Sequence, residues 1–314
     1  MDQIGRRFLG YFGKMLILAG MVLVFGSFGV FLSNILTKLF LGVDLSTIDF
    51  SAIKKEDVQM IAALKLYQTI GGGIGMFLVP ALLFPAAIKY PIHVMFMNKN
   101  RIDVKSLFVG ILSIILVTPL ISWLYQLNQQ MHFPESWKEW EISIKNMEAQ
   151  AELLTNLFVS ADTYPMLLLN IFVVALVPAI CEELFFRGII LQYTRFIFDK
   201  EWIAVVVSAI VFSGFHGQFY GFIPRFVLGI LLGYLFLNSA NILLPILAHF
   251  VNNALAVLAV FYQKELAVFE VFTPDYQFAW YWVVLSALLS IAAIWYIKNT
   301  LLQALLNQSK NELL

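Results

Sequence analysis

The segment "PMLLLNIFVVALVPAICEELFFRGII" (residues 165–190) joins an apolar run to a compact group of charges. Residues 165–178 carry no charge, and Glu182, Glu183 and Arg187 follow within the next nine positions. A charged side chain at the centre of a bilayer costs roughly 2.5 to 3.5 kcal/mol on insertion scales, so such residues are retained where they have partners or a function. The segment therefore indicates a membrane helix that carries functional charges.

The composition of the whole chain extends this interpretation. Of its 314 residues, 61% are hydrophobic and 13% are charged, against about 25% charged residues in ordinary soluble proteins. Mean hydropathy is +0.83. We predict an all-α, polytopic membrane protein in which residues 1–314 form a single integral membrane domain. The formal net charge is zero, which gives no reason to expect a nucleic-acid partner. The single cysteine, Cys181, excludes an intramolecular disulfide framework.

Membrane spans follow from the length of the apolar runs, because a helix needs about 20 apolar residues to cross a bilayer. Eight segments are candidates, near residues 13–36, 67–88, 107–126, 165–187, 202–217, 221–237, 241–262 and 278–298. The fifth of these segments is short, and the fifth to seventh are joined by few residues, which predicts a tight antiparallel cluster.

The charges of the loops predict the orientation, because Lys and Arg are retained on the cytosolic side. The first span has Arg6, Arg7 and Lys14 on its N-terminal flank. The loop between the third and fourth spans is mainly acidic, and the segment 37–66 is balanced in charge and uninformative. We expect a cell membrane, the inner membrane of a bacterium, with both termini in the cytosol. The basic loop that supports this expectation follows the second span and contains Lys89, Lys99, Arg101 and Lys105 against Asp103.

Residues 135–157 have apolar side chains at helical spacing with charges between them, which predicts an amphipathic helix on the outer membrane surface. Two groups of glycines, residues 71–75 and the pair Gly229 and Gly233, resemble nucleotide-binding loops superficially. Because no strand is expected before them and their neighbours are apolar, we interpret them as sites of close helix packing.

The three charges of the opening segment differ in their expected partners. Glu183 and Arg187 are four residues apart, so they share one face of a helix and can form an ion pair. Glu182 lies about 100° around the helix from Glu183, so this pattern leaves it without a partner. Glu182 is therefore the carboxylate that we expect to take part in chemistry.

Two of the four histidines fall in apolar segments, His216 in "VFSGFHGQ" and His249 in "PILAHFVNNAL". Asn253 lies one helical turn after His249. A carboxylate, two imidazoles and an amide suit hydrolysis, which needs a base, a group that orients water and donors for the oxyanion. We expect Glu182 near the cytosolic end of its span, and His216 towards the outer side unless its short span ends at mid-depth. The alternative is that these side chains only join helices, at about 0.6 kcal/mol per hydrogen bond.

Three motifs resemble those of a known family of membrane proteases. "EELFFR" (182–187) resembles EExxxR, "FSGFH" (212–216) resembles FxxxH and "HFVNN" (249–253) resembles HxxxN. They occur in the order found in the CAAX protease and bacteriocin-processing (CPBP, or Abi) family, and the resemblance covers the motif-bearing helices of residues 165–262. It implies an intramembrane endopeptidase.

The resemblance also implies a role for each site residue. Glu182 would activate the attacking water together with His216. His249 and Asn253 would stabilise the oxyanion, and Glu183 with Arg187 would hold the site in shape. The substrate would be a membrane-embedded or membrane-associated peptide or protein, and the sequence leaves open whether it is lipidated.

The sequence leaves the cofactor open between none and zinc. The family has been described both as metalloproteases and as metal-independent glutamate proteases. Glu182, His216 and His249 are candidate zinc ligands with water in an open position. Asn253 is a poor zinc ligand, which favours the metal-free alternative. Two other functions stay open, a transporter in which Glu182 and Glu183 relay protons and a non-catalytic scaffold for other membrane helices.

Three further residues in or near the motifs are Cys181, Phe212 and Arg225. A lone thiol in apolar surroundings is inert, so Cys181 is not expected to be a nucleophile. Phe212 is expected to pack and to shape the wall of the site. Arg225 follows Pro224 at the start of the sixth predicted span, and the sequence leaves open whether it reaches a membrane interface or meets a substrate carboxylate.

Overall fold

The computed structural model describes residues 3–47, 53, 57–96, 103–198, 200–262, 266–273 and 276–312. No strand occurs in these residues, and almost all of them are helical. The predicted all-α fold is therefore confirmed. Lys99 and Arg101, which contribute to the predicted orientation, lie outside the described residues.

Within the described residues, seven helices are long and apolar enough to cross a membrane, which confirms a polytopic membrane protein. The eighth predicted span, near 202–217, is a helix, α10 (Glu201–Phe215), but its 15 residues extend only about 22 Å. The hydrocarbon core of a bilayer is about 30 Å thick, so α10 is too short for a full crossing. The seven long helices are Gly10–Leu41, Val58–Ala87, Val104–Gln129, Tyr164–Phe198, Phe222–Ser239, Leu243–Tyr262 and Trp280–Gln303.

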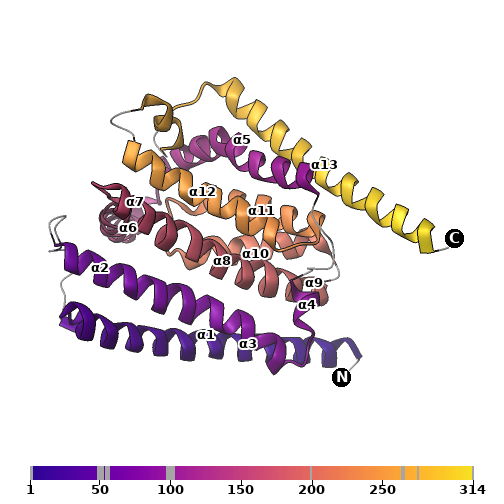
Figure 1. Cartoon of the computed structure of the whole chain (residues 1–314), viewed down its shortest axis with the longest axis horizontal. Helices are drawn as coiled ribbons and strands as arrows, with labels where there is room; N and C mark the ends of the chain where they lie inside the picture. Colours follow the sequence, from indigo (N-terminus) through magenta and orange to yellow (C-terminus); the bar gives the residue numbers. More distant parts are fainter. Residues whose placement is uncertain are drawn as a thin grey trace.

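The helices lie side by side in one bundle (Figure 1). At one edge of the bundle, α1 (Gln3–Leu41) packs against the long helix formed by α2 (Val58–Tyr67), a π-helical segment (Gln68–Leu78) and α3 (Val79–Ala87). At the opposite edge, α5 (Val104–Gln129) packs against α13 (Trp280–Glu312). The helices that carry the motifs lie between these two edges and are therefore covered on both sides by the rest of the chain.

The central helix of the bundle is longer than the sequence predicts. It runs from Tyr164 to Phe198 through α7 (Tyr164–Asn170), α8 (Val177–Glu183), α9 (Gln192–Phe198) and two π-helical segments, Ile171–Leu176 and Leu184–Leu191. The predicted end near residue 187, with Glu182 close to the cytosolic end, is wrong. Glu182 lies near the middle of the helix, because the charges around it have buried partners and do not mark an interface.

Two further helices complete the central part. α11 (Phe222–Ser239) and α12 (Leu243–Tyr262) form a hairpin next to α10, as the predicted tight cluster requires. Gly229 allows α11 to approach α10 closely, since a Cβ atom at this position would lie 3.0 Å from the Cβ of Ala209. A Cβ atom on Gly75 would lie 2.7 Å from the carbonyl oxygen of Phe25 on α1. Both glycine groups therefore serve helix packing, as predicted.

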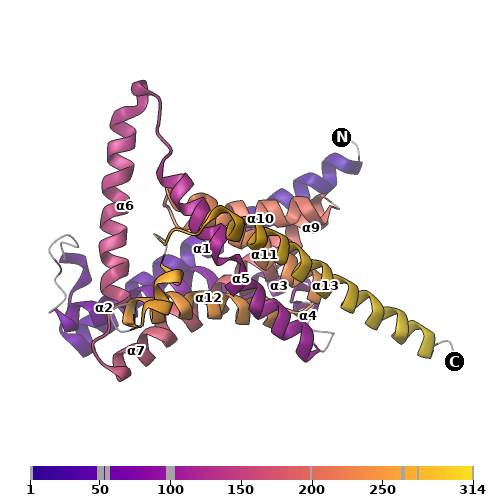
Figure 2. The same ribbon diagram turned by 90° about the horizontal axis from the view of Figure 1, so that it is seen from above.

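A separate helix, α6 (Lys138–Val159), follows a short turn at Glu135–Trp137 and runs across the other helices at one end of the bundle (Figure 2). We call this end the α6 end. Trp137, Trp140 and Met147 are exposed on it. The predicted amphipathic helix is thus present, and its contact with a membrane surface stays a prediction.

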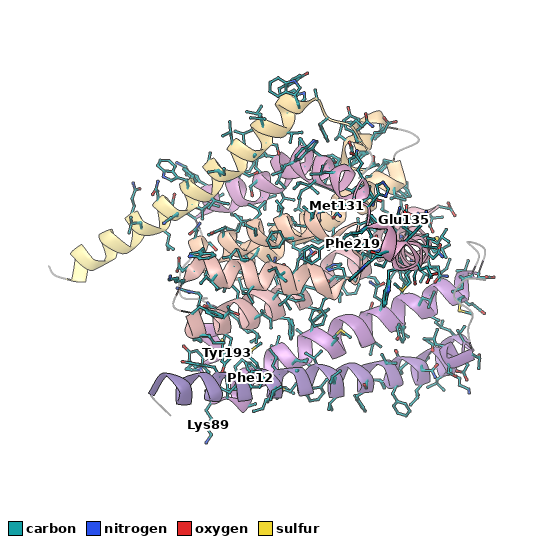
Figure 3. The ribbon with its side chains drawn as sticks, turned by 180° about the vertical axis from the view of Figure 1, so that it is seen from behind. Phe12, Lys89, Met131, Glu135, Tyr193 and Phe219 are labelled. Atoms are coloured by element: carbon teal, nitrogen blue, oxygen red, sulfur yellow. The ribbon has the colours of Figure 1, made fainter. Side chains whose placement is uncertain are left out.

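The loops at the two ends show how α10 runs. Figure 3 places Phe219, which follows α10, with Met131 and Glu135 at the α6 end, and Tyr193, which precedes α10, with Phe12 and Lys89 at the other end. α10 therefore runs towards the α6 end. Both chain termini lie at the end opposite α6 (Figure 1).

The predicted loop of residues 37–66 is too long, because the helix that follows it begins at Val58 and includes Lys65. Lys65 has only 6% of its surface exposed, and its Nζ donates to Asn170 Oδ1 at 2.6 Å. Asn170 in turn donates to the carbonyl oxygens of Val159 and Ser160 at the end of α6. This buried polar chain joins α2, α6 and α7 and offsets the cost of the lysine.

Candidate active site

An ion pair lies at the centre of the bundle. Arg187 Nη1 donates to Glu183 Oε1 at 2.7 Å, and both side chains are completely buried. This contact confirms the pairing predicted from their spacing of four residues. A buried ion pair is strongly destabilised when one partner is removed, because the other charge is then left uncompensated.

Arg187 also holds two neighbouring helices. Its Nη2 donates to the carbonyl oxygen of Gly229 on α11 at 3.2 Å, and its Cζ lies 4.6 Å from the ring centroid of Phe212 on α10. A guanidinium above an aromatic face in a desolvated site is attracted by the ring quadrupole. Arg187 therefore fixes α10 and α11 against the central helix.

His249 on α12 faces both carboxylates of the adjacent pair. Its Nδ1 donates to Glu183 Oε1 at 2.7 Å, and its Nε2 lies 4.0 Å from Glu182 Oε2. The hydrogen bond to Glu183 fixes the orientation of the ring, as carboxylates commonly do for functional histidines. The sequence did not reveal this contact, because no spacing rule relates a residue of α12 to one of α8.

Glu182 has a different environment from its neighbour. Its side chain is 15% exposed, and its nearest ion-pair partner among the described residues is His249, at 4.0 Å. Its Oε2 atom is buried and accepts no hydrogen bond from the described part of the chain. A buried carboxylate oxygen without a donor is costly, so this atom is ready to accept a hydrogen bond from a ligand. The predicted unpaired carboxylate is thus present.

The short α10 brings His216 to the depth of Glu182. Glu182 lies 16 residues, or about 24 Å, before the end of the central helix at Phe198, and α10 rises about 21 Å from Glu201 to Phe215. The central helix ends and α10 begins at the same end of the bundle, and the two helices run in opposite directions. His216 therefore follows α10 at mid-depth, the second of the two arrangements that the sequence allowed.

Phe212 links the two histidines. Its ring packs edge-on against His216 and His249, with centroid distances of 5.1 and 5.7 Å. The Phe212 carbonyl oxygen lies 2.9 Å from His216 Nδ1 and can accept a hydrogen bond from it. Phe212 thus forms the wall between the imidazoles, as expected. No hydrogen bond joins His216 to Glu182 in the residues that the structure describes.

Asn253 lies one turn after His249 on α12, and its Oδ1 accepts a hydrogen bond from Asn252 Nδ2 at 3.1 Å. No hydrogen bond joins it to Glu182 or His216 among the described side chains. Of the predicted site residues, the structure joins Glu182, Glu183, Arg187 and His249 closely. It places His216 beside them through Phe212 and leaves Asn253 on the next turn.

The side chains of Glu182 and His249 are spaced more widely than zinc ligands. Ligand distances of about 2 Å at tetrahedral angles put two ligand atoms roughly 3.3 Å apart, whereas Glu182 Oε2 and His249 Nε2 are 4.0 Å apart. Within the described ranges, no three His, Cys, Asp or Glu side chains are grouped as metal ligands would be. The arrangement of these residues thus does not fit a zinc site.

Cys181 lies next to Glu182 in sequence, and its side chain packs against Gly73. It is 1% exposed, and its Sγ lies 3.7 Å from the position that a Cβ atom on Gly73 would occupy. The thiol therefore fills space between α8 and the glycine-rich segment of its neighbour, as its apolar surroundings suggest.

The helices that carry the site are similar to a known protein family. Residues 164–255 match the family model described as type II CAAX prenyl endopeptidase Rce1-like. The matched segment begins with α7, ends within α12 and includes all six predicted site residues. Searches of curated proteins and of solved structures gave no match. The chain is therefore an integral membrane protein whose residues 164–255 are similar to the Rce1-like type II CAAX prenyl endopeptidases.

Proposed function

We propose that this chain is an intramembrane endopeptidase that hydrolyses peptide bonds of membrane-embedded or membrane-associated substrates with a water activated by Glu182. The observation that carries the proposal is the position of His249 between two carboxylates of different character. In the described part of the chain both carboxylates keep a buried Oε2 atom without a donor. Glu183 accepts hydrogen bonds from Arg187 and His249 at its Oε1 atom, whereas Glu182 has only the 4.0 Å approach of His249.

Glu182 is the general base in this mechanism. Its free oxygen accepts a proton from water, and the water oxygen then attacks the carbonyl carbon of the scissile bond. With Nδ1 of His216 donating to the Phe212 carbonyl, Nε2 of the neutral ring carries a lone pair. That lone pair accepts the second hydrogen of the water and orients its oxygen towards the substrate.

His249 and Asn253 act on the oxyanion. Because Nδ1 of His249 is held by Glu183, a second proton on this ring would reside on Nε2, which faces Glu182. Such an N–H and the side-chain amide of Asn253 are donors for the negative charge that develops on the carbonyl oxygen. The proton taken up by Glu182 passes to the leaving amide nitrogen, which completes hydrolysis.

Glu183 and Arg187 are positioning residues in this proposal. Both are completely buried, and Glu183 acts through the ring of His249. The ion pair with Arg187 holds the Glu183 carboxylate, one of the two adjacent carboxylates of the site. The other carboxylate, Glu182, is thereby left for the substrate and its water.

The proposal includes no metal ion. The separation of 4.0 Å between Glu182 and His249 supports this choice, as does the amide of Asn253 at a position where zinc prefers nitrogen, sulfur or carboxylate ligands. Zinc held by Glu182, His216 and His249 is the alternative, and the measurement that separates the two is given in the Discussion.

The experiment that tests the function uses purified full-length protein in liposomes with synthetic peptides that contain one apolar segment. Mass spectrometry should detect new termini at or near the border of that segment, and paired prenylated and unmodified peptides should reveal whether a lipid is required. A transporter would leave every peptide intact and would dissipate a proton gradient monitored by an entrapped pH dye. A scaffold would do neither.

A further inference from the structure

The loop that carries His216 is anchored by a residue from a distant part of the chain. We call residues 216–221, which join α10 to α11, the His216 loop. The chain turns sharply near its start, because Gly217 has a φ angle of +65°, in the left-handed region that favours glycine. Further along, the backbone N–H of Tyr220 donates to both carboxylate oxygens of Glu148, at 3.0 and 3.3 Å. The loop therefore depends on Glu148 for one of its backbone hydrogen bonds.

Glu148 belongs to α6, the helix that crosses one end of the bundle, and it precedes Tyr220 by 72 residues in the sequence. It falls outside residues 164–255, the segment that is similar to the Rce1-like endopeptidases. A hydrogen bond to a charged acceptor is roughly twice as strong as one between neutral groups. Gly221 directly precedes α11, so the Glu148 carboxylate also lies near the positive end of the dipole of that helix. Both effects favour a carboxylate at this position.

A second residue of α6 contacts the same part of the loop. Lys145 Nζ lies 5.4 Å from the ring centroid of Tyr220, and Lys145 and Glu148 are three residues apart, on one face of α6. Tyr220 is buried, and its ring packs edge-on against Phe219 at a centroid distance of 5.2 Å. The Phe219 ring lies 4.9 Å from that of Phe133, which precedes α6. The chain around α6 is thus attached to the loop at Phe219 and Tyr220.

The helices next to the loop hold it at other points. Ser213 Oγ donates to the carbonyl oxygen of Phe222 at 2.7 Å, which joins the end of α10 to the start of α11. Arg225 Nη2 lies 3.4 Å from the carbonyl oxygen of Gln218, in the first half of the loop. Glu148 adds an anchor in the second half, from a helix that is neither α10 nor α11.

The position of the His216 ring depends on this loop. His216 directly follows α10, and its backbone N–H donates to the carbonyl oxygen of Ser213 at 3.3 Å. Its ring Nδ1 lies 2.9 Å from the carbonyl oxygen of Phe212, so the proposed mechanism uses Nε2 to orient the water. A misplacement of about 1 Å that arises far from the reacting atoms can cost roughly 10²-fold in rate. A shift of the loop should therefore be felt at Nε2.

We propose that Glu148 is a positioning residue for His216. Its carboxylate holds the Tyr220 N–H, which fixes the His216 loop and thereby the Nε2 atom that orients the water. This inference rests on the proposed endopeptidase function, and it gives α6 a part in the active site. The alternative is that Glu148 only attaches α6 to the bundle.

The first arm of the test observes His216 without catalysis. The chain has four histidines, so NMR of full-length protein labelled with ¹⁵N-histidine in detergent gives few ring signals, which single His→Gln variants assign. Glu148→Ala should shift the His216 signals, because the loop loses an anchor. It should leave those of His249 in place, since Glu183 holds that ring. Unchanged His216 signals in folded Glu148→Ala protein would overturn the proposal.

Two further variants control this arm. Glu148→Gln should bring the His216 signals back towards those of the parent, because its amide oxygen still accepts from the Tyr220 N–H. Glu152→Ala is the matched control, since Glu152 lies one turn further along α6 and is exposed. It should leave the His216 signals where they are in the parent. A shift of equal size in Glu152→Ala would show a general response to changes in α6 and would contradict a specific role of Glu148.

The second arm measures cleavage. We expect Glu148→Ala to lower kcat by about 10- to 100-fold with KM within about threefold of the parent, because the loss lies in the orientation of water and not in substrate binding. Glu148→Gln should recover most of this rate, and Glu152→Ala should keep it.

A double-mutant cycle separates positioning from a general structural effect. If Glu148 acts through His216, adding Glu148→Ala to His216→Ala should cost less than about threefold in rate, because the group that it positions is already absent. A second loss as large as that in the single variant would show that Glu148 acts by another route and would overturn the assignment.

Melting temperatures identify variants that do not fold. If Glu148→Ala is one of them, Glu148→Asp takes its place, since the shorter side chain keeps the charge but withdraws the carboxylate from the Tyr220 N–H. Positioning predicts that Glu148→Gln stays closer to the parent than Glu148→Asp in the His216 signals. The opposite order would show that the charge matters and the hydrogen bond does not, which contradicts the proposal.

The outcome is separable from that of the proposed function. His216 signals that follow Glu148 in a protein that cleaves no peptide would keep Glu148 as the residue that positions His216 and refute the endopeptidase. Cleavage that Glu148→Ala leaves unchanged would refute the positioning role and leave the endopeptidase standing.

Discussion

The Nδ1 atom of His249 lies 2.7 Å from Oε1 of Glu183, although 66 residues separate them in the sequence. Arg187 donates to the same oxygen at 2.7 Å. One carboxylate oxygen therefore serves as acceptor for an arginine of its own helix and for a histidine of α12. This shared oxygen is the point at which the packing of the bundle and the geometry of the site depend on each other.

Loss of the arginine should destabilise the bundle as well as the site. We expect Arg187→Ala to lower the free energy of unfolding in detergent by about 3 to 5 kcal/mol, because it leaves Glu183 charged and buried. Arg195→Ala, which removes a partly exposed arginine, should cost less than about 1 kcal/mol. Thermal unfolding of both variants tests this, and an Arg187→Ala protein that melts with the parent would contradict a buried pair.

A double substitution separates stability from positioning. Replacing a whole buried ion pair with apolar residues of similar size is often neutral for stability. Glu183→Leu combined with Arg187→Met should therefore recover much of the stability lost in Arg187→Ala. It should not recover cleavage, since His249 would lack the acceptor for Nδ1.

The pH dependence of α6 provides an independent prediction. Hydrogen bonds from Lys145 and His132 lower the pKa of Glu141 from 4.5 to about 2. Because this pKa is lower in the folded state, the stabilisation by Glu141 is complete above about pH 4.5 and is lost as the pH falls towards 2. The melting temperature of Glu141→Gln should lie below that of the parent at pH 7, and the two should converge between pH 4.5 and 2. A difference that does not change with pH would show that the Glu141 charge is not responsible.

The metal content distinguishes the two proposed chemistries. The metal-free mechanism predicts no stoichiometric zinc by elemental analysis and cleavage that is unaffected by a strong chelator. One zinc per chain that is lost, together with activity, in both His216→Ala and His249→Ala would favour the metalloprotease.

The orientation in the membrane is tested with reporter fusions. Fusions after Asn98 and after Lys200 should report the cytosol, and fusions within α6 should report the outer side, because the loop between α3 and α5 carries the excess of basic residues. The opposite pattern would place both termini and the basic loop outside.

The sequence predicted the features that depend on local spacing. Apolar length predicted the helices, and the interval of four residues predicted the Glu183–Arg187 pair. The order of the motifs predicted which helices surround the site. These rules apply within one helix, where geometry is set by the helical repeat.

The features that the sequence did not reveal depend on contacts between helices. The bond of His249 to Glu183, the bond of Lys65 to Asn170 and the bond of Tyr220 to Glu148 each join segments that no periodicity relates. The end of the central helix was misplaced for the same reason. A charge inside a membrane helix marks an interface only when no buried partner compensates it.

The most direct test of the proposed mechanism is the rate at which Glu182→Gln protein cleaves a peptide that the parent protein cleaves. The substitution keeps the shape of the side chain and removes the base. We expect the cleavage rate to fall by at least ~10² while the melting temperature stays close to that of the parent. Glu139→Gln, on the exposed face of α6, should retain the parent rate. A folded Glu182→Gln protein that cleaves at the parent rate would contradict the assignment of Glu182 as the base.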